Sequence, residues 1–422
     1  MSAESAPLPS AAPESVGITQ GSRSWWLVLA AVGIAAGLAG AAYVELLRLV
    51  TKVLGPEHFA RWTHLLVLGA VGISIAILVH LLGSPGDVEL LVDNIHVGGR
   101  PADLRALRTL IPVSLLGIAA GSAIGPEAPL VQTTGTLGSW IAGRCRLSAV
   151  DTRILGITGM AAGFTVLFGA PLGSALFALE ILHRRGLEYY EALLPAAIGA
   201  LAGWIVYTQA MRSGFRPVWE FPTVKSMGSV DLAIGLGAGI AAAAIASLFG
   251  LVVGLLRRIN ARIPTIARPM IGGLALGGLA FASPYSLTFG EVQIEHIALS
   301  RLAVGTLLLA GVCKLAATSI VVTAGWRGGF IIPLFFMGAT VGLAAGHVLH
   351  GHDVVLMTAM MAATNVGVTK TPFGSTAVVA EMSGMRLLPP VLIACLVSLF
   401  LTNKVSIIHT QRSRVHVMMP SA

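Results

Sequence analysis

The sequence predicts an all-α polytopic membrane protein of two pseudo-symmetric halves that contain short and broken helices. Three observations lead to this fold class: the composition, a series of apolar segments and an internal repeat. Of the 422 residues, 55% are hydrophobic and only 11% are charged, whereas a soluble domain carries about 25% charged residues. The 50 glycines suit close helix packing in lipid. A multi-pass protein of the cell membrane is therefore expected.

The formal net charge of +8 comes from basic residues that gather mostly between the apolar segments, as in the cluster Arg257, Arg258 and Arg262. Basic loops of this kind are typical of the cytoplasmic side of a membrane, so the charge does not indicate nucleic acid binding. The three cysteines are scattered and form no CxxC pair, which argues against a disulfide framework or a zinc site. No metal or cofactor is predicted.

The chain divides into five parts by composition. Residues 1–22 are rich in Ala, Pro and Ser and are expected to form a flexible tail. Residues 23–210 form a first transmembrane half, and a polar connection at 211–228 precedes the second half at 229–407. Residues 408–422 form a basic C-terminal tail.

The apolar segments follow one another with short breaks, and several are shorter than the ~20 residues that a full crossing needs. In the first half they span 25–50, 64–82, 102–124, 130–142, 152–168, 171–182 and 189–207, with a short helix and a loop expected within 88–100. In the second half they span 230–256, 269–282, 303–323, 334–349, 354–363, 372–382 and 389–401, with a polar loop expected at 291–296.

The two halves repeat one another. Upstream, Gly125, Pro129, Leu130 and Gly138 recur as Gly329, Pro333, Leu334 and Gly342 at an offset of 204. Downstream, Pro171, Gly173, Ser174 and Glu180 recur as Pro372, Gly374, Ser375 and Glu381 at an offset of 201. Short, Gly- and Pro-interrupted segments in matching places of two halves indicate a transporter site built from broken helices.

The central motif is Gly125-Pro126-Glu127-Ala128-Pro129, at the break between two apolar segments. An acid at membrane depth is costly and usually faces a cavity or a partner. Glu127 and Phe330 both fall where a helix is expected to begin, and the first turn of a helix offers unpaired N–H groups and a partial positive charge. Two such ends form an anion site, to which Ser84 would add a hydroxyl donor. The Glu127 carboxylate is predicted to block this site and to leave it on protonation.

These residues resemble the CLC family of chloride channels and proton-coupled exchangers. The Glu127 motif is similar to that family's GxExP signature, Gly328-Gly329-Phe330-Ile331-Ile332-Pro333 to its GGxFxP segment, and Gly83-Ser84-Pro85 to its GSGIP segment. Ala170-Pro171-Leu172, with Phe177 and Glu180, resembles its APLxGxxFxxE helix.

The resemblance implies a homodimer with one anion pathway per subunit and two inverted halves. It makes Glu127 the gating candidate. The anion-binding candidates are Ser84, Pro126, Ala128, Phe330 and Ile331.

The chain departs from the family at two positions that bear on proton coupling. Exchangers often carry a second acid where this chain has Ile181, and a tyrosine where it has Ile407. The missing acid favours passive conduction or an altered proton route.

Each candidate also has a purely structural interpretation. Glu127 would be a buried acid in a salt bridge or hydrogen bond. Ser84 would serve as a helix cap or turn residue, and Phe330 and Ile331 as packing residues. Glu180 and Glu381 would hold loops near the cytoplasmic face. Three further residues, His347, His350 and His352, do not share one helical face and so do not indicate a metal site.

Lys314 lies inside an apolar segment. It is expected to have a structural role, either pairing with a carboxylate or extending its ammonium group toward the membrane surface.

The predicted function is transmembrane anion transport, foremost of chloride, gated by the protonatable Glu127. The alternative is a proton-coupled antiporter of chloride or another halide, with protons as a second partner besides the anion and the lipid bilayer. A remote alternative is an intramembrane enzyme that uses Glu127 as acid or base. The sequence shows neither an HExxH motif nor a nucleophile–base pair, so no enzyme activity is expected.

Overall fold

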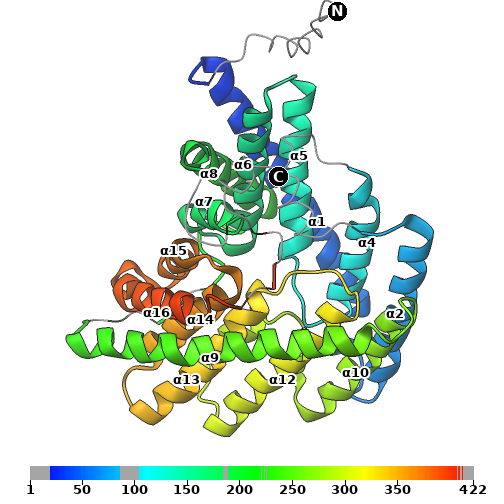
Figure 1. The fold of residues 1–422 in the computed structure, drawn as a ribbon, viewed down its shortest axis with the longest axis vertical. Helices are drawn as coiled ribbons and strands as arrows, with labels where there is room; N and C mark the ends of the chain where they lie inside the picture. The colour runs from blue at the N-terminus through cyan, green and yellow to red at the C-terminus, as the bar shows by residue number, and fades with distance from the viewer. Residues whose placement is uncertain are drawn as a thin grey trace, which may run out of the picture.

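The computed structural model describes residues 20–85, 104–183, 189–219, 221–222, 224, 226–405, 407–408 and 411. The described chain consists mainly of helices (Figure 1). Seven of its helical segments are long and apolar enough to cross a membrane: Arg23–His58, Thr63–Leu82, Ala149–Phe168, Tyr190–Met211, Ser229–Asn260, Val304–Thr323 and Ile331–Leu349. The predicted polytopic helical class is confirmed.

The helices fall into two series with the same order and similar lengths. The first series is α1 (Arg23–Leu54), α2 (Thr63–Leu82), α4 (Arg105–Ala119), α5 (Glu127–Arg144), α6 (Ala149–Phe168), α7 (Pro171–Glu180) and α8 (Leu193–Met211). The second is α9 (Ser229–Asn260), α10 (Arg268–Ala282), α12 (Val304–Thr323), α13 (Ile331–Leu349), α14 (Asp353–Thr369), α15 (Pro372–Ser383) and α16 (Leu388–Leu401).

Matching helices make matching contacts, so the repeat in the sequence is a repeat in the packing. Helix α5 packs on α6 as α13 packs on α14, and α1 packs on α8 as α9 packs on α16. Figure 1 shows α9 crossing the molecule, with α10, α12 and α13 on one side of it and most of the first series on the other. The predicted limits 23–210 and 229–407 fall beside the end of α8 and the start of α9; as domain limits they stay a prediction.

Glycine allows the helices within each half to approach closely. A side chain at Gly37 of α1 would meet the backbone of Gly203 in α8, and one at Gly239 of α9 would meet the backbone of Ala394 in α16. Since helices in lipid associate through close van der Waals packing, these contacts explain part of the high glycine content.

The two halves are joined by a reciprocal contact between α7 and α15. The Glu180 carboxylate, at the end of α7, accepts hydrogen bonds from the N–H groups of Phe373 (3.1 Å) and Gly374 (2.6 Å) in the first turn of α15. The Glu381 carboxylate near the end of α15 accepts one from Gly173 N–H in the first turn of α7. The expectation that the two acids hold loops is therefore wrong. They cap the N-terminus of the opposite helix, where a negative charge is favourable.

The polar loop expected at 291–296 is also wrong, because these residues belong to the short helix α11 (Glu291–Leu299). Its Ile294 and Ile297 are fully buried and lie on one face at a spacing of three. A single buried pair in a polar stretch is too short a pattern to identify a helix from sequence.

Lys314 lies in α12 and is fully buried. Its Nζ donates to Leu287 O (2.9 Å), Thr288 O (2.6 Å) and Gln293 Oε1 (2.9 Å), and it lies 4.9 Å from the centroid of the Phe336 ring. Among the described residues it neither pairs with a carboxylate nor extends to the surface. It holds the segment 287–293, which precedes α12, against the core, so its role is structural.

Some residues of both predicted tails form hydrogen bonds with the rest of the chain. Ser22 caps α1 by accepting from Trp25 N–H, and Gln20 Nε2 donates to Asp151 Oδ1 (2.7 Å). In the C-terminal tail, Gln411 is buried and its Nε2 donates to Ile181 O (2.9 Å) and Thr369 O (2.8 Å). The short helix and loop expected within 88–100 lie outside the described residues.

Candidate functional site

The site is built where the breaks before α5 and α13 meet. Gly125 N–H donates to Gly329 O (2.8 Å), and Gly329 N–H donates to Gly125 O (2.7 Å), which forms an isolated antiparallel bridge. These are the two glycines that the repeat pairs at an offset of 204. The bridge holds the N-termini of the two helices beside each other.

Proline and glycine in both motifs suit this geometry. Pro129 and Pro333 are each the third residue of their helix, where the N–H has no intrahelical partner and proline is tolerated. A side chain at Gly125 would collide with the Oε2 atom of Glu127. At Gly329, an added Cβ would lie 2.5 Å from the same atom. The two glycines therefore leave the space that the carboxylate occupies.

Glu127, the first residue of α5, reaches across to the other helix. Its Oε1 accepts a hydrogen bond from the backbone N–H of Ile332 (2.6 Å), in the first turn of α13. The side chain is 1% exposed, and its Oε2 is buried without a hydrogen-bond partner among the described residues. A carboxylate thus occupies a helix N-terminus, the place where anions bind favourably.

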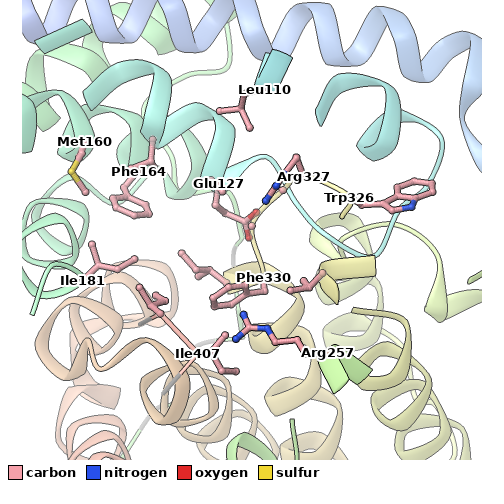
Figure 2. Close-up of a pocket in the computed structure, with 17 residues that line it drawn as sticks. Leu110, Glu127, Met160, Phe164, Ile181, Arg257, Trp326, Arg327, Phe330 and Ile407 are labelled. Carbon is pink, nitrogen blue, oxygen red and sulfur yellow. The ribbon is translucent and has the colours of Figure 1, made fainter. Parts of the chain in front are cut away.

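A cavity of about 170 Å³ adjoins the carboxylate (Figure 2). It is lined by Leu110, Glu127, Ala128, Val131, Met160, Phe164 and Ile181 from the first half, and by Arg257, Val322, Trp326, Arg327, Gly328, Gly329, Phe330, Ile331, Ile407 and Ile408 from the second. The walls are largely apolar, and the charged side chains on them are Glu127 and two arginines.

The cavity combines features that suit a small anion. Helix N-termini supply N–H donors, and the arginines supply fixed positive charge. Among the described residues, no group of three or more His, Cys, Asp or Glu side chains that could hold a metal ion occurs.

Residues 83–403 match the profile of the family described as voltage gated chloride channel, which covers most of the chain. The chain belongs to this family. It is therefore a membrane protein that transports anions, in a family of channels and transporters.

Similar proteins agree with this assignment. The chloride/fluoride channel protein of Pseudomonas syringae pv. tomato is 29% identical over 426 residues, which cover 94% of this chain and 88% of that protein. A solved CLC-type fluoride/proton antiporter has a TM-score of 0.79 at 22% identity, over 92% of this chain and 98% of its own.

A slow cyanobacterial Cl⁻/H⁺ antiporter has a TM-score of 0.80 at 19% identity, over 91% and 95%. The two structural similarities show that this family member has the CLC fold of two inverted halves.

The structure brings some of the predicted site residues to this cavity and leaves others out. Ala128, Phe330 and Ile331 line it, while Pro126 does not and has no N–H to donate. The N–H that bonds Glu127 is that of Ile332, one residue beyond the predicted pair.

Ser84 lies elsewhere, exposed at the end of α2. It lines a second cavity of about 510 Å³, together with His80, Arg268 and Arg327. Arg327 lines both cavities. A role of Ser84 in anion binding therefore stays a prediction.

Ile181 and Ile407 stand where exchangers often carry an acid and a tyrosine, and both line the Glu127 cavity.

Sequence reasoning missed three residues of the site: Ile332, which donates to Glu127, and Arg257 and Arg327, which line the cavity. The repeat could have indicated Ile332, since it is equivalent to Ala128 at an offset of 204. Arg257 gave no separate signal, because it stands in a basic cluster that the positive-inside rule already explains.

Proposed function

We propose that this protein moves chloride through a pathway that passes the N-terminus of α13 and is gated by Glu127. The observation that carries the proposal is the hydrogen bond from Ile332 N–H to Glu127 Oε1. With the carboxylate on this N–H, an anion has no access to it. Protonation removes the charge that holds the side chain against the helix N-terminus, and the side chain then leaves the site to the anion.

The choice between conduction and proton coupling depends on what lies behind the gate. Ile181 and Ile407 line the cavity, and neither side chain can carry a proton. This favours passive movement of the anion. Proton-coupled antiport is the second candidate, because solved proteins of the same fold are described as fluoride/proton and Cl⁻/H⁺ antiporters. Fluoride is the second candidate anion, since a relative is described as a chloride/fluoride channel protein.

Purified protein in liposomes tests both parts of the proposal. Anion efflux and proton uptake are recorded together under a chloride gradient and then under a fluoride gradient. Chloride efflux without coupled proton uptake supports conduction. Proton uptake in fixed proportion to anion efflux supports antiport and contradicts conduction. An absence of both anion fluxes in correctly inserted protein contradicts the proposal.

The functional unit is a homodimer in this proposal. Leu172 of α7 and Phe373 of α15 are equivalent by the repeat and are 61% and 43% exposed, so a second copy could cover both at once. Light scattering of the detergent-solubilised protein measures the protein mass. A single-chain mass under mild conditions contradicts the dimer.

A further inference from the structure

The cavity beside Glu127 extends from a buried end to an exposed residue. Glu127 is 1% exposed, whereas Arg257, in the last turn of α9, is exposed and lines the same cavity. In Figure 2 the Arg257 side chain points toward Phe330 and Ile407, and in this view Phe330 lies between it and Glu127. Arg257 therefore stands at the mouth of the cavity.

Part of the cavity wall is apolar. Ile181, Ile407 and Ile408 are 3%, 4% and 5% exposed and line the cavity with Arg257. An anion entering here loses water and meets no polar side chain from these three residues, which is unfavourable. Low-dielectric walls also focus the field of a nearby charge, so that one cation at the mouth raises the local concentration of anions.

Arg258 provides a comparison within the same helix turn. It is also exposed and also lies in the last turn of α9, but it is not among the residues that line the cavity. Both arginines complement the negative end of the helix dipole. A role in the anion pathway would make their substitutions differ in chloride flux, and Arg257→Lys separates this role from a structural contact of Arg257.

We infer that Arg257 is the entrance cation of this pathway: it draws small inorganic anions into the Glu127 cavity. The inference rests on the proposed function and adds to it the residue that governs anion capture. Arg257 acts on anion entry and not on the gate. Its substitution should therefore change the anion concentration that gives half-maximal flux, and should change the maximal flux much less.

The test measures initial chloride flux in liposomes at several chloride concentrations, with gluconate salts used to vary ionic strength. The interaction between exposed charges is largely screened beyond about 30 Å at 0.01 M salt and beyond about 10 Å at 0.1 M salt. Arg257→Gln is expected to lower flux several-fold at low chloride and low ionic strength, with little loss at saturating chloride. Its flux should also depend less on ionic strength. Arg258→Gln removes the same charge and should behave like the wild type.

Arg257→Lys separates capture from a structural role. A lysine retains the charge and is expected to keep flux near the wild-type value with the same ionic-strength dependence. Equal losses in Arg257→Gln and Arg258→Gln overturn the inference, as does a loss in Arg257→Lys as large as that in Arg257→Gln. Wild-type protein that moves no anion overturns the proposed function as well, whereas normal wild-type flux that Arg257→Gln leaves unchanged overturns only the role of Arg257.

Discussion

The backbone N–H of Ile332 donates to the Glu127 carboxylate at 2.6 Å, although the two residues are 205 positions apart in the chain. The contact exists because Gly125 and Gly329 pair directly and so bring the N-termini of α5 and α13 together. A negative side chain at a helix N-terminus is in the same position as a bound anion. The Glu127 carboxylate thus occupies the position that a bound anion would take.

Adding one methyl group at Gly125 should disturb this arrangement selectively. The three nearest atoms to a Cβ at this position all belong to the Glu127 carboxyl group, so Gly125→Ala displaces the carboxylate from the Ile332 N–H. We expect chloride flux at neutral pH to rise and its pH response to weaken. Gly228→Ala is the control, because nothing lies within 4 Å of an added Cβ there. An unaltered pH response in Gly125→Ala would show that the carboxylate does not need this space.

The exchange of caps between α7 and α15 predicts a loss of stability from a substitution at either acid. In Glu180→Gln, the amide NH₂ group faces a backbone N–H, so one of the two bonds to Phe373 and Gly374 is lost along with the charge. Glu381→Gln removes the negative charge from the N-terminus of α7, where Gly173 N–H donates to this side chain. Each should destabilise the protein by about 1–3 kcal/mol, measured as a lower Tm in detergent. In contrast, Glu45→Gln alters a side chain that is 52% exposed and should leave Tm unchanged; an equally small effect of Glu180→Gln would refute the capping role.

Removal of the Lys314 ammonium should loosen the connection before α12. Lys314→Met leaves Leu287 O, Thr288 O and Gln293 Oε1 without this donor. The bond to Leu287 O is buried and the other two are partly buried, and a buried acceptor that loses its partner costs about 1–3 kcal/mol. We expect a lower Tm and faster proteolysis between α10 and α12. The exposed Lys52 provides the control, Lys52→Met. Proteolysis of Lys314→Met at the wild-type rate would mean that the segment is held by its apolar contacts alone.

Sequence reasoning reached the fold because the signals were long and repeated. Apolar segments of membrane length identified the main helices, and the offsets of 201 and 204 paired the residues that the structure places in α7 with α15 and at the Gly125–Gly329 bridge. It did not reach α11, whose two buried isoleucines form no extended pattern.

The candidate site was reached only in part, for a physical reason. Several N–H groups at the start of a helix are unpaired, and the rotation of the helix against its neighbour decides which of them faces a partner. The sequence does not show this rotation, so it indicated Phe330 and Ile331 and not Ile332. Glu180 and Glu381 were noticed as a repeated pair, but their partners are backbone amides, which leave no trace in the side-chain sequence. Arg257 was read as part of a basic loop and lies in a helix.

The most direct test of the account is the pH dependence of chloride flux in the Glu127→Gln variant. Glutamine approximates the protonated, uncharged side chain, so it has no charge to hold it at the N-terminus of α13. Purified wild-type and variant proteins are compared in liposomes between acid and neutral pH. Glu45→Gln serves as the matched control, since Glu45 is an acid with a side chain that is 52% exposed. Wild-type and Glu45→Gln flux should rise as the pH falls, whereas Glu127→Gln flux should be high and constant; a Glu127→Gln variant that keeps the wild-type pH response would contradict the account.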